Sequence, residues 1–540
     1  MKKLLVLLLI SGMAYGQNYT RQDSLRGQIT AERAWWNLQQ YELRVEVDIE
    51  NKSIQGINLI RYEVLNEGEQ RLQLDLQRPM KIDKVLQDGV ELKVDKEGIA
   101  HYVTLVKKQI KGENESLEVF FHGKPKIARN PPWDGGFVFT QDSNGLPFVA
   151  NANQGIGASI WWPNKDHPYD EPDLGTLIAV TVPKDLMNVS NGQLVKVDST
   201  ESSKTYSWKV VNPINNYGIN VNIGDYVHFG ETYAGESGPL KVDYYVLREN
   251  EEKARKQFQQ TTGMLQAFEH WFGPYPFYED GFKLVEAPYL GMEHQSSVTY
   301  GNGYKNGYRG MDLSGSGWGM KFDFIIIHEA GHEWFANNIT NDDVADMWIH
   351  EGFTAYSECL YLDYHHGPKA AADYVIGTRK IIQNDIPIIG DYGVRNEGSS
   401  DMYYKGANML HTLRMLIEDD ELWRSILRGL NKDFRHQTVS SKQVEDYISE
   451  KTGKDLSAFF NQYLRTTQIP KLEFKIVEDA IQYRYIDVVE DFDMPIIAMI
   501  NDEQRWIFPS ANWKNEKLDE TVKFFAIKRD FYVEPILVEE

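Results

Sequence analysis

The chain has 540 residues, 42% of them hydrophobic and 25% charged, and its formal net charge is −22 at pH 7. This length argues against a single hydrophobic core and predicts about three or four domains. The acidic balance argues against nucleic acid or an anionic membrane as a partner. The only cysteine, Cys359, cannot form an internal disulfide and is expected to be a small buried apolar residue.

The first sixteen residues have the pattern of a secretory signal peptide. Lys2 and Lys3 form a basic start, an apolar run covers residues 4–10, and small residues lead up to Gly16. The apolar run is too short to span a bilayer, so we expect cleavage after Gly16 and no stable membrane insertion. A secreted chain without disulfides is typical of a bacterial envelope or extracellular enzyme, which predicts a secreted or periplasmic location.

Residues 17–235 are expected to form an N-terminal β domain. Apolar and mostly charged residues alternate over residues 41–49, and leucines alternate over residues 72–76, which is the pattern of half-buried strands. Further strand-like runs cover residues 119–123 and 180–183.

Residues 236–467 are expected to be mainly helical, and residues 468–540 to return to strands. Helical composition begins at residue 251, and alternating strand patterns return at residues 472–476 and 481–485. The chain is therefore expected to be an α+β multidomain protein, with an N-terminal β-sheet domain, a mainly helical catalytic domain and a small C-terminal β domain.

The most informative segment runs from His328 to His332 and has the sequence H-E-A-G-H, a zinc-binding pattern. On a helix, residues i and i+4 share one face, so both imidazoles can bind one ion. Glu351 follows after eighteen residues, 333 to 350, and can supply a third ligand from the next helix. Two imidazoles and one carboxylate leave one tetrahedral position open, which is typical of catalytic zinc. Glu329 can then act as a general base toward water.

The sequence W-I-H-E-G-F at residues 348–353 resembles the third-ligand segment of the zinc aminopeptidase family that includes aminopeptidase N and leukotriene A hydrolase. The resemblance extends from about residue 41 to residue 470. It implies a thermolysin-like catalytic domain with one Zn²⁺ per chain, held by His328, His332 and Glu351, and with Glu329 as the base.

Residues 290–294, with the sequence L-G-M-E-H, resemble that family's Gly-x-Met-Glu-Asn exopeptidase motif. The resemblance assigns Glu293 to the free α-amino group of the substrate, with Gly291 and Met292 beside it in the substrate-binding segment. A carboxylate that faces an ammonium group forms a charge-assisted hydrogen bond, which would place the first peptide bond at the metal.

Two positions depart from this motif. Leu290 replaces the opening glycine and His294 replaces the closing asparagine, which affects the backbone geometry and the neighbouring subsite. Between this motif and the zinc-binding pattern, residues 301–319 are rich in Gly and Tyr and predict a loop near the site, either a lid or a plain connector.

Two further segments are similar to family segments. Y-Y-K-G at residues 403–406 matches a Tyr-x-Lys-Gly run, which assigns Tyr403 to the oxyanion of the tetrahedral intermediate and leaves Tyr404 to pack. Gln154, nine residues before Pro163, resembles the glutamine that helps to hold the substrate amine. A structural loop glutamine is the alternative.

These features predict a secreted zinc aminopeptidase that removes N-terminal residues from peptides with a free N-terminus through a metal-activated water. Two alternatives stay open: a zinc endopeptidase of the same class, which would not need Glu293, and a non-catalytic binding protein on the same fold. His350, His365 and His366 lack a partner at ligand spacing and are expected to have packing or surface roles.

Overall fold

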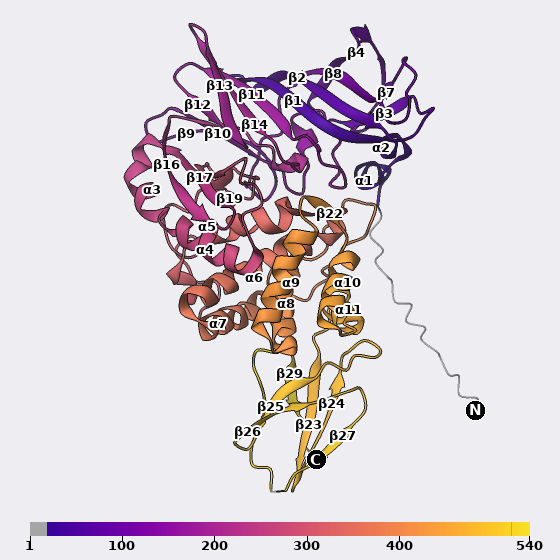
Figure 1. Ribbon diagram of the computed structural model, residues 1–540, viewed down its shortest axis with the longest axis vertical. Coiled ribbons are helices and arrows are strands. Elements are labelled where there is room, and N and C mark those ends of the chain that lie inside the picture. Colours follow the sequence, from indigo (N-terminus) through magenta and orange to yellow (C-terminus); the bar gives the residue numbers. More distant parts are fainter. Residues whose placement is uncertain (1–18, 520, 540) are drawn as a thin grey trace, which may run out of the picture.

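The computed structural model describes residues 19–519 and 521–539, so the expected signal peptide at residues 1–16 lies outside the described residues. The chain forms three regions in succession along the long axis of the molecule: a β-rich end, a helical middle and a second β-rich end (Figure 1). This arrangement confirms the predicted α+β class. Within the described residues, no helix combines the length and the apolar character needed to cross a membrane.

The N-terminal region is built mainly from strands. Its elements are α1 (Arg21–Gly27), α2 (Ala31–Ala34), β1 (Trp36–Asp48), β2 (Ser53–Val64), β3 (Arg71–Asp75), β4 (Lys81–Gln87), β5 (Val90–Glu91), β6 (Lys93–Glu97), β7 (Ala100–Thr104), β8 (Asn114–Gly123), β9 (Gly136–Gln141), β10 (Pro147–Ala152), η1 (Ala158–Ile160), β11 (Thr176–Pro183), β12 (Met187–Val189), β13 (Gln193–Ser199), β14 (Ser203–Val210), η2 (Asn216–Gly218) and β15 (Asn222–Gly224).

These strands form three sheets, in the orders β13-β14-β11-β1-β2-β8-β4-β5, β12-β15-β10-β9 and β3-β7-β6. The alternation seen in the sequence sets their faces: Leu43, Val45 and Val47 of β1 are at most 3% exposed, whereas Arg44 and Glu46 between them point outward. The buried faces form a hydrophobic core of their own.

The helical region begins with a small sheet. Its elements are β16 (Tyr226–Gly235), β17 (Gly238–Leu247), η3 (Arg248–Asn250), α3 (Glu251–Gln257), α4 (Gln260–Phe272), β18 (Phe282–Glu286), β19 (Gly291–Met292), β20 (Val298–Tyr300), η4 (Trp318–Lys321), α5 (Phe324–Gly331), η5 (Glu333–Asn337), β21 (Ile339–Asn341), η6 (Val344–Asp346), α6 (Trp348–His366), α7 (Pro368–Thr378), η7 (Arg379–Ile381), η8 (Ser400–Met402), α8 (Tyr404–Ile417), α9 (Asp420–Asp433), β22 (Gln437–Val439), α10 (Ser441–Thr452) and α11 (Ser457–Arg465).

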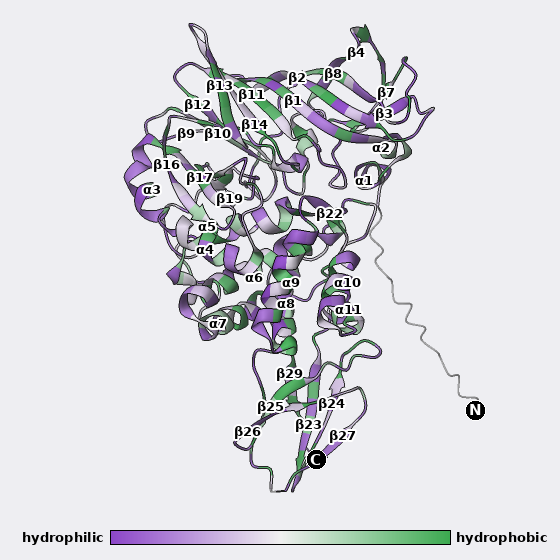
Figure 2. Ribbon diagram, viewed as in Figure 1, coloured by the Kyte–Doolittle hydropathy of each residue, from purple (hydrophilic) through white to green (hydrophobic). Residues whose placement is uncertain are grey.

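The sheet has the order β16-β17-β18-β20-β19, which leaves β19 at an edge. The expected domain boundary between residues 235 and 236 falls in the turn of the β16–β17 hairpin, where Gly235 faces Gly238. Helix α3 lies on the outside and is hydrophilic along its length (Figure 2), with Ala254 as its buried residue. Helix α6, in contrast, is buried over its first fifteen residues, 348 to 362.

The C-terminal region consists of β23 (Lys471–Val477), β24 (Ala480–Ile486), β25 (Ile496–Ile500), β26 (Glu503–Ile507), β27 (Lys514–Lys517), β28 (Phe525–Ile527) and β29 (Glu534–Leu537). They form sheets in the orders β27-β24-β23-β29 and β26-β25-β28. Their apolar residues join the core of the helical region in one continuous cluster. The hydroxyl of Tyr463 donates to the carbonyl of Tyr532 at 2.8 Å across this junction.

Candidate active site

Helix α5 carries the zinc-binding pattern into the interior. Asp323 caps its N-terminus by accepting a hydrogen bond from the backbone N–H of Ile325 at 3.1 Å. All eight residues of the helix are buried, and His332 occupies the cap position at its end. The backbone then leaves the helical path at Phe335 (φ −129°, ψ 90°). This break turns the carbonyl of Phe335 toward Nδ1 of His332, at 3.1 Å.

Helix α6 places Glu351 in its first turn, facing both histidines. Oε2 of Glu351 lies 3.3 Å from Nε2 of His332 and 3.7 Å from Nε2 of His328. The two imidazole centroids are 5.0 Å apart, and the three side chains are at most 6% exposed. The structure thus brings the three predicted metal ligands together on two helices in contact.

These donors fit a divalent metal ion. His328 contacts Oε1 of Glu358 through Nδ1 at 2.8 Å, and His332 contacts the Phe335 carbonyl through Nδ1. With the proton on Nδ1, the Nε2 atom of each ring has a lone pair that faces the space between the three candidate ligands. Within the described chain, buried Oε2 of Glu351 has no hydrogen-bond partner, an unfavourable state that a bound cation would relieve. Two imidazole nitrogens and one carboxylate oxygen are the ligands that catalytic zinc takes.

Glu329, the predicted base, lies against the edge strand β19. A Cβ atom at Gly291 would come within 2.9 Å of Oε1 of Glu329, so glycine is what allows this strand to approach the carboxylate. Burial, reinforced by the carboxylate of Glu293, raises the pKa of Glu329 to about 7. A general base at neutral pH works best in this range.

Glu293 and Gln154 meet although they come from different regions of the chain. Nε2 of Gln154 donates to Oε1 of Glu293 at 2.7 Å and to Oε1 of Glu351 at 2.9 Å. The hydroxyl of Tyr217 donates to the same oxygen of Glu293 at 3.1 Å. Both donors bind the same oxygen, Oε1, of Glu293. Gln154 therefore connects the predicted amine-binding carboxylate with a predicted metal ligand.

Of the two adjacent tyrosines, Tyr403 lies beside the metal ligands. Its ring stacks on the imidazole of His328, with centroids 5.9 Å apart and planes at 22°. Burial, followed by the carboxylates of Glu351 and Glu293, raises the pKa of Tyr403 well above its usual value, so the phenol keeps its proton at neutral pH. For Tyr404, burial and then another carboxylate, that of Glu358, raise the pKa.

A cleft of about 820 Å³ opens over these residues, between the N-terminal and helical regions. The N-terminal region contributes Trp133, which is 54% exposed at the rim. The glycine-rich loop at residues 301–319 contributes Tyr308, and the segment before η8 contributes Glu397. The predicted loop therefore lines the cleft.

The remaining predictions near the site concern single residues. Cys359 is buried in α6, as expected. His350 accepts a hydrogen bond from a backbone N–H at 2.9 Å and belongs to neither of the candidate metal clusters in the described chain, which agrees with a packing role. At the two positions that depart from the exopeptidase motif, Leu290 lines the cleft and His294 is fully buried.

Several residues that orient the ligands are absent from the sequence-based prediction. Glu358 follows Glu351 by seven residues on α6, a spacing that returns to the same helical face and could have indicated it. The carbonyl of Phe335 and the hydroxyl of Tyr217 reach the site through tertiary contacts and leave no local pattern.

An H-E-x-x-H helix and a glutamate on the following helix, below a substrate-sized cleft, define the gluzincin class of metallopeptidase sites. Residues 257–463 match the Peptidase family M1 domain.

Named relatives agree with this match. Probable aminopeptidase 1 of Sulfurisphaera tokodaii is 21% identical over 468 residues, which cover 83% of this chain and 55% of the relative. Leukotriene A-4 hydrolase of Xenopus laevis is 24% identical over 288 residues, which cover 50% of this chain and 44% of the relative. This chain thus spans about half the length of these two relatives.

The fold matches a crystal structure of an M1 zinc metallopeptidase from Deinococcus radiodurans. The TM-score is 0.69 at 20% sequence identity, and the match covers 81% of this chain and 95% of the other.

Proposed function

We propose that this protein is a zinc-dependent aminopeptidase that hydrolyses the first peptide bond of peptides with a free N-terminus. One observation carries the proposal: the amide of Gln154 binds both Glu293 and Glu351, so a carboxylate suited to an ammonium group lies next to the candidate metal ligands. A variant of the Deinococcus enzyme is described in complex with a Tyr-Ser-Ala substrate, which supports a peptide as the substrate class.

The roles follow from the positions of the side chains. His328, His332 and Glu351 would hold zinc, which when bound supplies Lewis acidity and lowers the pKa of water. Glu329 accepts the proton of the attacking water and returns it to the leaving amine. Tyr403 donates a hydrogen bond to the oxyanion. Glu293 holds the substrate ammonium and so fixes which bond is cut.

The test compares matched peptides with free and acetylated N-termini, with and without a chelator, by mass spectrometry of the products. Free peptides are expected to lose residues one at a time. Acetylation removes the ammonium charge, and losing a hydrogen bond to a charged group costs about 1.5–3 kcal/mol, or roughly ten- to a hundred-fold in kcat/KM. Glu293→Ala should slow only the free peptides, whereas Glu252→Ala on the exposed face of α3 should change neither.

Each alternative has its own outcome in this assay. Internal cuts in acetylated peptides that persist in Glu293→Ala would make the protein an endopeptidase of the same class. A zinc-loaded wild-type protein that binds peptides and cleaves none would be a binding protein.

We further propose that residues 1–16 are a signal peptide and that the mature protein is secreted or periplasmic. The support is the basic start and apolar run of the sequence. The mass of the mature protein recovered from the producing cells should correspond to a chain that begins at Gln17. Recovery of the uncleaved chain from the cytoplasm alone would contradict it.

A further inference from the structure

The loop that carries Gln154 is held by two arginines from different regions of the chain. Residues 153–157 connect β10 with η1. Nε of Arg395 donates to the carbonyl of Gly155 at 2.6 Å, and a terminal guanidinium nitrogen of Arg26 donates to the carbonyl of Ile156 at 2.6 Å. Arg26 belongs to α1 of the N-terminal region, whereas Arg395 precedes η8 in the helical region. Two successive carbonyls are thus bound from two different regions.

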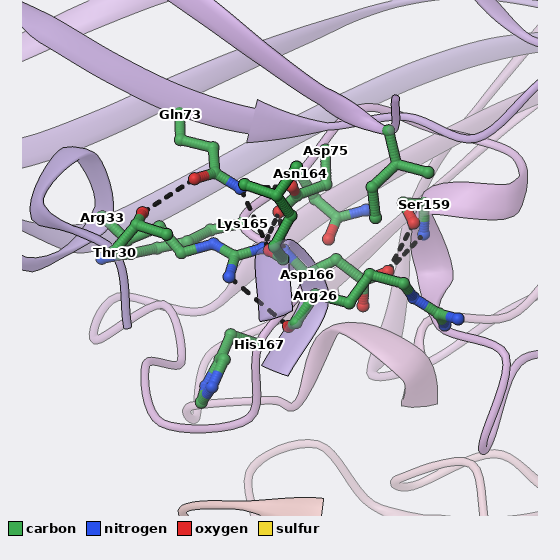
Figure 3. A network of polar contacts seen from close by, with 12 residues as sticks. Arg26, Thr30, Arg33, Gln73, Asp75, Ser159, Asn164, Lys165, Asp166 and His167 are labelled. Atoms are coloured by element: carbon green, nitrogen blue, oxygen red, sulfur yellow. Dashed lines mark hydrogen bonds and ion pairs between the residues drawn. The ribbon is translucent and has the colours of Figure 1, made fainter. Parts of the chain in front are cut away.

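Asp166 is the carboxylate next to both arginines. Figure 3 shows it beside Arg26 and Ser159 in a network of buried polar side chains. Its Oδ1 lies 3.7 Å from Arg395, and its Oδ2 accepts from the hydroxyl of Ser159 at 2.5 Å. A Cβ atom at Gly157 would come within 2.2 Å of Oδ2 of Asp166, and φ of Gly157 is 89°. The backbone of the loop therefore packs directly against this carboxylate.

Charge explains why these groups occur together. Burial and the nearby Arg395 lower the pKa of Arg26 to about 10, because two guanidinium groups in one buried place repel each other. Asp166 offsets this repulsion, and despite its burial the two arginines hold its pKa below the usual value. The backbone N–H of Asp166 donates to Asp75 at 3.1 Å, and Asp75 pairs with Arg33 at 2.6 Å in the interior. The network therefore anchors the loop to the N-terminal sheets.

We propose that Arg395, together with Asp166, is a positioning residue that fixes the amide of Gln154 between Glu293 and Glu351. One amide nitrogen bonds two carboxylates, at 2.7 and 2.9 Å, so a loop displacement of about 1 Å breaks at least one of these bonds. Arg395 thereby couples the N-terminal region to the substrate-binding site. Its effect on catalysis rests on the proposed aminopeptidase function, whereas its effect on the loop does not.

The first measurement needs no enzymatic activity. Amide hydrogen–deuterium exchange of the full protein is followed by mass spectrometry in the wild type, Arg395→Met and Arg428→Met. Arg428 is the matched control because it also donates to a backbone carbonyl, that of His270, but outside the catalytic cleft. We expect Arg395→Met to raise exchange in peptides that cover residues 153–158 by about tenfold, as for loss of a charged hydrogen bond. Unchanged exchange there would overturn the proposal.

The second measurement separates positioning from a general structural role. The kcat/KM for a free tripeptide is measured for Arg395→Met, Gln154→Ala and the double variant. Arg395→Met should lower kcat/KM about tenfold in the wild-type background and less than about twofold in the Gln154→Ala background, because a residue that acts through Gln154 has nothing left to position. An equal loss in both backgrounds would show that Arg395 acts elsewhere.

Conservative variants keep the test decisive if Arg395→Met does not fold. Arg395→Lys retains the charge and a donor and should recover part of the activity, and Asp166→Asn should show the same dependence on Gln154. If the wild type cleaves no peptide, the proposed function fails while the exchange result still decides the role of Arg395. If the wild type cleaves peptides but Arg395→Met does not change the exchange of the loop, the inference on Arg395 fails and the proposed function stands.

Discussion

Nδ1 of His328 lies 2.8 Å from Oε1 of Glu358, and Glu358 is fully buried. The other oxygen of this carboxylate accepts a hydrogen bond from the hydroxyl of Tyr374 at 2.6 Å. A carboxylate that accepts from Nδ1 keeps the proton on that nitrogen. The lone pair of Nε2 then faces the space between the three candidate ligands, and the basicity of Nε2 increases. One candidate ligand is therefore oriented by a residue that would itself not touch the metal.

Replacing Glu358 by Gln should weaken zinc binding without removing a ligand. The amide still accepts the His328 hydrogen bond but lacks the negative charge, and loss of such supporting contacts costs roughly 10–100-fold in metal affinity. The dissociation constant is measured by competition with a chromogenic chelator. Tyr374→Phe, which removes only the second hydrogen bond of Glu358, should have a smaller effect. An unchanged zinc affinity in Glu358→Gln would refute the orienting role.

His332→Ala should abolish zinc binding and turnover while the protein stays folded. The N-terminal region has a separate hydrophobic core, and the C-terminal region joins a core that extends well beyond the site. Zinc content is determined by elemental analysis and folding by circular dichroism. His365→Ala, which changes an exposed histidine, serves as the control and should retain full zinc. Full zinc in His332→Ala would remove this histidine from the ligand set.

The sequence predicted those parts of the site that depend on local geometry. The i, i+4 spacing of His328 and His332 places both side chains on one face whatever the rest of the fold does. The eighteen residues before Glu351 are enough for a turn and the start of the next helix. The same holds for the strands of the N-terminal region, whose alternation already separates the buried face from the exposed one.

The parts that could not be predicted depend on contacts between distant segments. The family resemblance brings Gln154 to the substrate amine, but nothing near it in the sequence indicates that its amide would also reach Glu351, 197 positions away, or that Arg395 would bind the next carbonyl. Such contacts are set by packing of whole regions.

Tyr403→Phe should lower turnover on the order of 10²–10³-fold, as for loss of one oxyanion donor, because its phenol lies beside the His328 ring and keeps its proton. Tyr404→Phe is the matched control and should change kcat little. Steady-state kinetics on a free peptide, at equal zinc content, give both values. A normal Tyr403→Phe enzyme beside an impaired Tyr404→Phe enzyme would transfer the role to Tyr404.

The buried histidine of the N-terminal network predicts how stability depends on pH. His167 contacts the carbonyl of Gly27 through Nε2 at 3.1 Å and accepts from the backbone N–H of Tyr169 on Nδ1 at 3.3 Å, which is the pattern of a neutral imidazole. Burial, reinforced by the guanidinium of Arg33, lowers the pKa of His167 to about 3. In the unfolded chain the pKa of histidine is about 6.5.

Between these two pKa values the unfolded chain binds a proton that folded His167 does not, so the free energy of unfolding falls as the pH drops from about 6.5 toward 3. Above pH 6.5 both states are neutral and the group adds no pH dependence. His167→Gln keeps a donor for the Gly27 carbonyl and cannot titrate. The decrease in apparent Tm between pH 7 and pH 4.5, measured by scanning calorimetry, should therefore be smaller in His167→Gln than in the wild type, whereas the surface control His365→Gln should match the wild type. Equal decreases in all three proteins would show that His167 does not contribute to acid sensitivity.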